Sequence, residues 1–184
     1  MKNNILPDGW KTVKLGEVCE IKKGEQLNRL DLTETGDYPC LNGGISASGY
    51  TNKWNTAKDT ITISEGGNSC GYVNFNKTKF WAGGHCYVLS NLKCDKLFLY
   101  QELKNKEKAI MRLRVGSGLP NIQKSAIVEF EITLPPLPVQ KEIAEILDKF
   151  DALTTSTKEC LQKEIELRTK QYEHYRNQLL NFSK

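Results

Sequence analysis

The distribution of proline and glycine is the sequence feature that most constrains the fold of this chain. Pro135, Pro136 and Pro138 stand within four positions, and neither proline nor glycine occurs after Pro138. All 14 glycines lie before Leu119. Because these two residue types favour turns and interrupt regular helices, we expect frequent turns in the first three-quarters of the chain. The last quarter is expected to form one uninterrupted helix.

The residues before the prolines predict short strands separated by turns. With 184 residues the chain has room for one ordinary domain and an appendage. β-branched and aromatic residues alternate between glycine pairs, a pattern typical of strands. The strands are expected over residues 17–24, 59–67, 70–76, 79–90 and 128–135, with a helix over about 94–112 and a short helical turn in 116–127.

The predicted fold is therefore α+β, a small mixed-strand domain followed by a long C-terminal coiled-coil helix. We expect the domain to comprise residues 1–138 and the helix to comprise residues 139–184. A helix of that length measures roughly 60 Å at about 1.5 Å per residue. The hydroxyl and β-branched residues at 153–157 lower helix propensity, so a break there, giving a hairpin, is an alternative.

An apolar track on the tail has the spacing of a coiled-coil seam. Its steps alternate between four and three residues, with one extra step of four at 157–161–165. A helix this long cannot bury such a stripe alone, so it must fold back on the domain or pair with another long helix. The expected interface residues are Ile143, Leu147, Phe150, Leu161, Ile165, Tyr172 and Leu179.

Composition excludes several classes of protein. No run of 18 apolar residues and no signal-peptide pattern is present, so we expect a cytoplasmic protein without a membrane span. The six cysteines include no closely spaced pair, which argues against a zinc site and for small buried side chains in a reducing compartment. We expect no metal and no cofactor.

Catalytic motifs are equally scarce. The sequence contains no phosphate-binding loop with the spacing G-x-x-x-x-G-K-[ST] and no Asn/Asp-Pro-Pro-aromatic motif of an adenine methyltransferase. Only two histidines, His85 and His174, could act as a base. We therefore expect a binding protein with no catalytic residue.

A basic cluster suggests what is bound. Within residues 91–124, eight basic residues stand against three acidic ones. Such a cluster can face DNA phosphates, although a solvated helix face is the alternative. Polar, glycine-rich loops at residues 41–54, 64–72 and 116–124 carry side chains of the kinds that read base edges.

Five segments in order resemble type I restriction-modification specificity subunits. They are "LPDGWKTVKLGEVCEIKKG" (6–24), "DTITISEGGNSCGYV" (59–73), "KFWAGGHCYVL" (79–89), "GSGLPNIQKSAI" (116–127) and "LPPLPVQKEIAEILDKFD" (134–151). The last is the most specific, because Pro-Leu-x-x-Gln followed by Ile-Ala-x-x-Leu is similar to the family's junction between recognition domain and helical spacer. The resemblance covers essentially the whole chain.

The resemblance implies a non-catalytic DNA-recognition subunit. Members of the family carry two recognition domains and two antiparallel helices, and each domain reads half of a split target. This sequence shows one domain, one helix and no internal repeat. The implied partners are double-stranded DNA, a second copy of the chain or a different half-subunit, a DNA methyltransferase subunit and a restriction/translocase subunit. A truncated or shuffled fragment acting as a stand-alone DNA-binding regulator is the alternative.

Candidate DNA-contacting residues follow from the basic cluster and the polar loops. For phosphate contacts they are Lys104, Lys108, Arg112 and Arg114. For base contacts they are Asn42, Ser46, Tyr50, Asn68, Ser69, His85, Ser117 and Asn121. Neither the recognised sequence nor the gap between half-sites follows from the residues.

Overall fold

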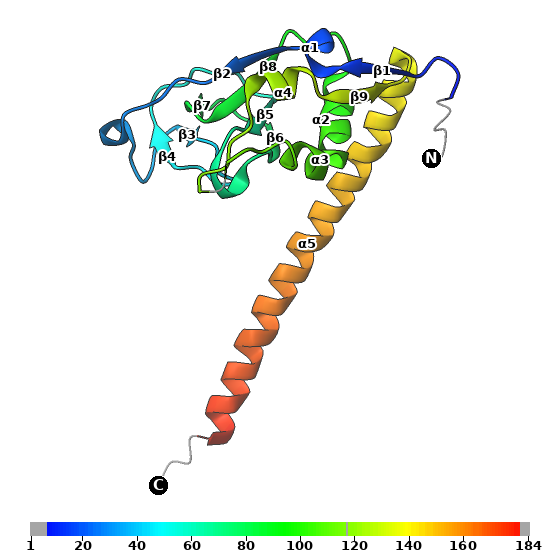
Figure 1. Cartoon of the computed structure of the whole chain (residues 1–184). Helices are drawn as coiled ribbons and strands as arrows, with labels where there is room; N and C mark the ends of the chain where they lie inside the picture. The colour runs from blue at the N-terminus through cyan, green and yellow to red at the C-terminus, as the bar shows by residue number, and fades with distance from the viewer. Residues whose placement is uncertain (1–6, 117, 181–184) are drawn as a thin grey trace. The chain divides into compact units, whose positions relative to one another are not determined.

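The computed structural model describes residues 7–116 and 118–180, which form two compact units (Figure 1). The described residues up to Ala144 form the first, which we call the N-terminal unit, and the residues from Glu145 form the second. Helix α5 (Leu137–Leu180) begins in the first unit and makes up the second. The predicted α+β fold, a mixed-strand domain followed by a long C-terminal helix, is confirmed.

Nine strands build three sheets in the N-terminal unit. Strands β2 (Glu20–Lys23), β8 (Cys86–Ser90), β5 (Thr60–Ser64) and β6 (Val73–Asn76) form the main antiparallel sheet in that order. A smaller sheet has the order β4 (Gly49–Thr51), β3 (Tyr38–Leu41) and β7 (Trp81–Ala82), with β7 parallel to β3. Strands β1 (Lys11–Lys14) and β9 (Glu131–Leu134) pair antiparallel.

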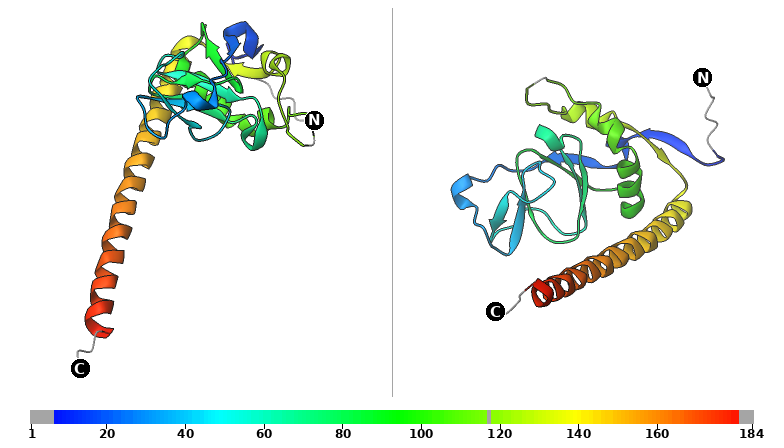
Figure 2. Two further views of the ribbon diagram at one scale, coloured as in Figure 1. Left: turned by 90° about the vertical axis from the view of Figure 1, so that its left-hand side faces the viewer. Right: turned by 90° about the horizontal axis from the view of Figure 1, so that it is seen from below.

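Short helices connect these strands. They are α1 (Leu15–Val18), η1 (Arg29–Asp31), η2 (Gly67–Ser69), α2 (Lys96–Asn105), α3 (Glu107–Met111) and α4 (Lys124–Val128). In the views of Figures 1 and 2, the small sheet and the helices α2 and α3 lie on opposite sides of the N-terminal unit. No helix in the described part of the chain is both long and apolar enough to cross a membrane.

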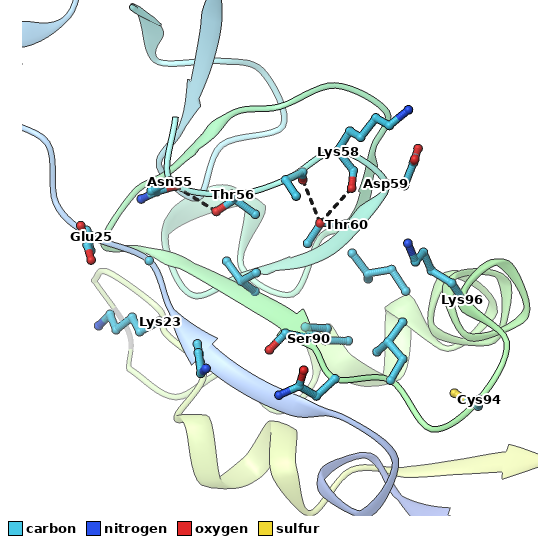
Figure 3. Close-up of a pocket in the computed structure, with 18 residues that line it drawn as sticks. Lys23, Glu25, Asn55, Thr56, Lys58, Asp59, Thr60, Ser90, Cys94 and Lys96 are labelled. Atoms are coloured by element: carbon cyan, nitrogen blue, oxygen red, sulfur yellow. Dashed lines mark hydrogen bonds between the residues drawn. The ribbon is translucent and has the colours of Figure 1, made fainter. Parts of the chain in front are cut away.

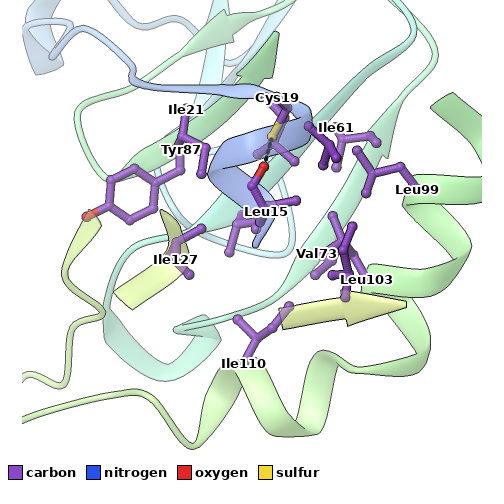
Figure 4. Packing of buried hydrophobic residues seen from close by; sticks show 14 of the residues in the cluster. Leu15, Cys19, Ile21, Ile61, Val73, Tyr87, Leu99, Leu103, Ile110 and Ile127 are labelled. Atoms are coloured by element: carbon purple, nitrogen blue, oxygen red, sulfur yellow. Dashed lines mark hydrogen bonds between the residues drawn. The ribbon is translucent and has the colours of Figure 1, made fainter. Parts of the chain in front are cut away.

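One hydrophobic core fixes the main sheet against the helices (Figure 4). Ile61 and Val73 contribute from the sheet, and Leu99 and Leu103 contribute from α2, all of them fully buried. A smaller cluster around Phe80 joins the main sheet to the small one. Full burial of one such side chain contributes about 1.5–3 kcal/mol, so these contacts dominate the stability of the unit.

The strand expected over residues 17–24 is wrong in its first part. Leu15 and Val18 are both buried, and residues three apart share a face only in a helix. The chain therefore makes the helical turn α1, in which Cys19 donates its thiol hydrogen to the Leu15 carbonyl at 3.3 Å. The strand β2 begins only at Glu20.

Other expected elements were also too long, including the strands expected over 59–67 and 70–76, which are β5 (Thr60–Ser64) and β6 (Val73–Asn76). The strand expected over residues 79–90 divides at Gly83, so that β7 joins the small sheet and β8 joins the main sheet. The helix expected over 94–112 starts after Asp95, whose carboxylate accepts from the Phe98 amide at 2.9 Å, and it breaks at Lys106. The strand expected over 128–135 begins at Glu131, because Val128 still belongs to α4.

The hairpin alternative for the tail is wrong, because α5 runs without a break from Leu137 to Leu180. The hydroxyls of Thr154 and Thr157 donate to the Phe150 and Leu153 carbonyls, each at 2.9 Å. These bonds satisfy the hydroxyl groups within the helix, so the low propensity of this stretch does not end it.

Gln140 anchors the first turns of α5 to the N-terminal unit. Its side chain is buried, accepts from the Asp95 amide at 2.8 Å and donates to the Pro135 carbonyl at 2.7 Å. Ala144, one turn later, is buried in the core. The helix start is therefore fixed by two buried hydrogen bonds as well as by apolar packing.

Replacing Gln140 with Ala should destabilise the N-terminal unit by about 2 kcal/mol, because a buried amide and a buried carbonyl lose their partner. The free energy of unfolding, measured with urea, tests this value. The neighbouring exposed Lys141→Ala is the control and should change stability little. Equal effects of the two substitutions would show that Gln140 is not an anchor.

Candidate functional site

The loop after β5 and the loop before α4 lie side by side, joined through their backbones. The Gly67 amide donates to the Pro120 carbonyl at 3.0 Å, and the Ile122 amide donates to the Glu65 carbonyl at 2.8 Å. Val115 and Asn121 exchange both of their backbone hydrogen bonds, which closes the second loop. Two segments about fifty residues apart in the sequence thus form one surface.

A third loop, after β3, packs against the turn before β8. Asn42 accepts from the His85 amide at 3.1 Å, and the Gly43 carbonyl accepts from the Ser64 hydroxyl. Gly43 has φ +82°, and a Cβ there would lie 2.7 Å from the His85 carbonyl. A Cβ on Gly83 would lie 2.5 Å from the Asn42 side-chain oxygen. Only glycine allows the two segments to approach so closely.

The three loops and the end of β2 enclose a cleft of about 460 Å³. The side chains that give it hydrogen-bonding character are Lys23, Asn42, Glu65, His85 and Asn121. We call this the loop cleft. Its lining combines a cation, an anion, an imidazole and two amides at the place where the polar loops meet.

Glu65 is the centre of the loop cleft. Its Oε1 accepts from the Lys23 ammonium at 2.6 Å, and its Oε2 lies 2.9 Å from Nδ1 of His85. The Tyr87 hydroxyl lies 3.2 Å from the same Oε1. Burial alone would raise the pKa of the Glu65 carboxyl, but the hydrogen bonds from Lys23, His85 and Tyr87 bring it below its ordinary value. Glu65 is therefore a carboxylate.

Tyr87 acts as a donor from beneath the loop cleft. Its hydroxyl lies 2.9 Å from the Ile122 carbonyl as well as close to Glu65. Burial and then the charge of Glu65 raise the pKa of Tyr87 to about 12, so the hydroxyl keeps its hydrogen at neutral pH. Tyr87 thereby links the Glu65 carboxylate to the second loop.

The structure brings several of the base-contact candidates together. Asn42, His85 and Asn121 line the loop cleft. Asn68 and Ser69 belong to η2 and directly follow Gly67, which also lines the cleft. Ser46 and Tyr50 do not line the loop cleft: Ser46 is exposed in the loop after β3, and Tyr50 is in β4 of the small sheet. Ser117 lies outside the described residues.

The phosphate-contact candidates differ in their surroundings. The ammonium of Lys104 already has partners within the chain, because it binds Glu107 at 2.6 Å and the Val73 carbonyl at 3.1 Å. Lys108, Arg112 and Arg114 are exposed. Burial raises the pKa of the Cys70 thiol while the charge of Arg114 opposes that rise, which places Arg114 near the loop after β5.

Sequence reasoning missed Lys23, Glu65 and Tyr87. The available signal was a charged residue at the end of a strand beside a glycine, as in Lys23-Gly24 and Glu65-Gly66. That signal is weak, since it does not show that the two side chains meet. Their pairing depends on β2 and β5 lying in one sheet, on either side of β8.

A larger cavity of about 710 Å³ opens beside β2, β5 and β8 (Figure 3). Its polar groups mostly hold the loop before β5 in place. Asn55 exchanges two hydrogen bonds with the backbone of Ala82, at 2.7 and 3.0 Å, and the Thr60 hydroxyl donates to the Ala57 carbonyl at 2.8 Å. Lys58 and Lys96, at its edge, add positive charge.

Helix α5 carries the second candidate surface. Phe150, Leu161, Ile165 and Tyr172 are between 58% and 65% exposed. Leu147 is half-buried, and nothing is described of the Leu179 side chain. Ile143 packs against the core of the N-terminal unit. The exposed apolar stripe of the described helix thus begins beyond Ile143.

The described residues contain no group of three or more His, Cys, Asp or Glu side chains arranged to hold a metal ion. Cys160 is exposed, whereas the other five cysteines are buried or half-buried and unpaired.

Comparison with protein families gives a match over most of the chain. Residues 7–167 match the family model described as the type I restriction modification DNA specificity domain. A putative type I specificity subunit of Mycoplasma pneumoniae is 38% identical over 169 residues, which are 90% of this chain and 44% of that protein. The specificity subunit of the Escherichia coli type I restriction enzyme EcoDI is 33% identical over 163 residues.

A solved structure has the same fold. The crystal structure of a type I restriction-modification system S subunit from M. genitalium superimposes with a TM-score of 0.80 at 32% identity, covering 98% of this chain and 48% of that one. The chain spans about half the length of two curated relatives that it matches, from M. pneumoniae and M. genitalium.

The hydrogen bonds to the Glu65 carboxylate should make the free energy of unfolding depend on pH. A lowered folded pKa means that the contribution of Glu65 is present above the ordinary pKa of glutamate, about 4.3, and is lost as the pH falls through the folded pKa. Glu65→Gln should therefore cost about 1 kcal/mol at pH 7 and progressively less below about pH 4.5. Urea unfolding across this pH range measures it.

Glu129→Gln is the control, since its partner Lys14 forms an exposed pair of the kind that contributes little. If Glu65→Gln changed stability equally at every pH, the carboxylate would not be the stabilising form.

Proposed function

Because the chain belongs to the family of type I restriction-modification DNA specificity domains, we propose that it recognises one half of a bipartite DNA target. In this proposal residues 1–138 are the target-recognition domain. Residues 139–184 are the spacer, the dimerisation element and the dock for a DNA methyltransferase subunit. Methylation and cleavage would be carried by partner subunits, and we assign no catalytic residue to this chain.

The observation that carries the proposal is the convergence of three polar loops on the loop cleft. Asn42, His85 and Asn121 reach it from three different segments, and backbone hydrogen bonds hold those segments in register. Asn side chains can discriminate base edges in a DNA groove, and an imidazole also offers hydrogen-bonding nitrogens. A rigid backbone beneath them favours reading one sequence over binding all sequences.

Exposed cations of the N-terminal unit would supply the attraction to phosphates. Arg114 near η2 is the first candidate, followed by Lys108 and Arg112 on α3 and its end. We leave Lys104 out, since its ammonium is bound to Glu107 and to a carbonyl. Asn121, Asn68, Ser69, His85 and Asn42 are proposed for base contacts.

Arg114→Ala and Asn121→Ala should have different effects on DNA binding. Loss of the arginine should weaken binding to every sequence. It should also reduce the slope of log affinity against log salt concentration by about one unit. Loss of the Asn121 side chain leaves its backbone bonds and should cost about 1–3 kcal/mol at one base pair. Fluorescence titration of the full chain on its selected target and on single-base variants, at several salt concentrations, separates the two.

Lys163→Ala on the exposed part of α5 removes a positive charge far along the chain and is the control. Equal losses on target and unrelated DNA for Asn121→Ala would remove this residue from the reading surface.

The exposed stripe of α5 supports the proposal of a helical partner. Four large apolar side chains more than half exposed on one face of a helix require cover in water. We propose the same helix of a second copy, packed antiparallel about a two-fold axis, because such a partner offers an identical stripe. The interface would use Leu147, Phe150, Leu161, Ile165 and Tyr172, with Leu179 at its far end.

Phe150→Asp should dissociate this dimer. Each copy loses an apolar side chain and gains a charge in the seam, so the dissociation constant should rise by about 100-fold or more. Light scattering at micromolar concentration should change from about twice 20.9 kDa to the monomer mass. Ala152→Asp adds the same charge about half a turn away from Phe150 and should leave the dimer intact. A monomeric wild type would contradict the proposal.

The length of the helix would then set the spacing of the two half-sites. A helix of roughly 60 Å corresponds to at most about 15–20 base pairs, at about 3.4 Å per base pair. Two identical recognition domains related by a two-fold axis would read an interrupted palindrome. The packing of the two α5 helices, and not the base-contacting loops, would fix the number of base pairs between the half-sites.

Inserting seven residues after Leu161 should lengthen the gap and leave the half-site unchanged. One heptad preserves the phase of the seam and adds about 10 Å, or roughly three base pairs. The added rotation along the DNA should also reduce affinity. Selection of bound sequences from a random DNA library by the wild type and the insertion variant reads out both quantities. An unchanged gap at unchanged affinity would show that α5 does not space the domains.

A further inference from the structure

The hydrogen bonds around Glu65 dictate where the hydrogen of the His85 ring sits. Glu65 is a carboxylate, and a carboxylate only accepts hydrogen bonds. Its Oε2 lies 2.9 Å from Nδ1 of His85, so Nδ1 must carry a hydrogen. In the neutral ring, the other nitrogen, Nε2, is then a pure acceptor.

The hydrogen bonds of Lys23 and Tyr87 to Glu65 hold its carboxylate in one orientation. The Lys23 ammonium on β2 and the Tyr87 hydroxyl on β8 both approach Oε1, and neither approaches Oε2. The thiol of Cys70 donates to the Glu65 backbone carbonyl at 3.2 Å and not to the carboxylate. Lys23 also balances the charge of Glu65, which would otherwise repel the phosphates of DNA.

His85 lines the loop cleft and contacts Glu65 through the ring atom Nδ1. Its side chain is 61% exposed, and its backbone amide is held by Asn42 at 3.1 Å. Among the residues that the structure describes, none forms a hydrogen bond with Nε2. Because Glu65 holds Nδ1, Nε2 is an acceptor in a fixed position on a residue that lines the loop cleft.

We infer that His85 is a specificity-determining residue whose Nε2 accepts a hydrogen bond from an exocyclic amino group of a base, with Glu65 as the positioning residue that sets the ring tautomer. In the major groove only adenine N6 and cytosine N4 are donors, whereas guanine and thymine present acceptors at the equivalent positions. The inference rests on the proposed function and deepens it, because it names the chemical class of the base read by one residue.

The two carboxylate oxygens of Glu65 have different partners, so Glu65→Gln should change which nitrogen of His85 carries the hydrogen. Lys23 and Tyr87 donate toward the Oε1 position, so the carbonyl of the glutamine should take that position. Its NH₂ group then faces Nδ1 of His85, which must accept. Nε2 becomes the protonated nitrogen and therefore a donor. The preference at one position should change from adenine or cytosine to guanine or thymine.

The first test reads the tautomer without DNA. Long-range ¹H–¹⁵N spectra of the full chain at pH 7.5 should show His85 protonated at Nδ1 in the wild type and at Nε2 in Glu65→Gln. His174, the second of the two histidines, lies exposed on α5 and serves as the internal reference. A wild-type ring protonated at Nε2 would overturn the inference.

The second test compares binding to the selected target and to its single-base variants. Wild type should discriminate against guanine and thymine at one position by about 10-fold, the value of one hydrogen bond. Glu65→Gln should reverse that preference, and the other positions should keep theirs. His85→Phe should abolish discrimination there without reversing it, and because the side chain is exposed this variant also serves if Glu65→Gln folds poorly. Glu129→Gln is the matched control.

The outcomes distinguish a failure of the proposed function from a failure of the inference about His85. A wild type without any sequence preference would overturn the proposed function, and the inference with it. A wild type with a clear preference that survives unchanged at every position in both His85→Phe and Glu65→Gln would overturn the inference alone.

Discussion

Glu65 is the residue on which the candidate site depends, because it contacts β2, the turn before β8 and the loop before α4. Its carboxylate binds Lys23 from β2 and His85 from the turn before β8, while its carbonyl accepts from Ile122 of the second loop. Its amide donates to the His85 carbonyl at 2.9 Å. Removing these bonds would leave the loops joined by fewer contacts, such as the bond from the Gly67 amide to the Pro120 carbonyl. Discrimination between base edges requires side chains in fixed positions.

The second constraint is the contrast between the two ends of α5. Its first turns are fixed by Gln140 and Ala144 within the N-terminal unit, whereas Phe150 and Leu161 expose their side chains. Burial at the start gives the helix a defined origin, and exposure beyond it gives a surface that needs a partner. Together they account for a chain that confines its glycines to one part and its uninterrupted helix to the other.

The sequence predicted the long helix well because proline and glycine act locally, and the absence of both after Pro138 left no competing structure. It predicted the strands β5 and β6 from their β-branched and aromatic residues. It missed β1, β3 and β4, which are three or four residues long and too short for a clear alternation. The division at Lys106 also escaped it, because it depends on the non-helical backbone angles of this one residue.

The candidate site could be predicted only in part, and for a related reason. Loop composition pointed to His85 and Asn121, since polar side chains in glycine-rich loops are accessible to a ligand, and both residues line the loop cleft. Lys23 and Glu65 were not found, because their 2.6 Å contact joins residues 42 positions apart. Lys104 was chosen for its charge, yet its pairing with Glu107 is a property of the folded chain. Sequence shows which groups are present, and tertiary structure shows which remain available.

Methylation mapping of DNA from cells that carry this chain together with a type I methyltransferase subunit tests the central claim most directly. The account predicts one interrupted palindrome in which both halves change together when Asn121 or His85 is replaced, while the gap stays constant. An uninterrupted target, or a target that is unaffected by these replacements, would contradict it.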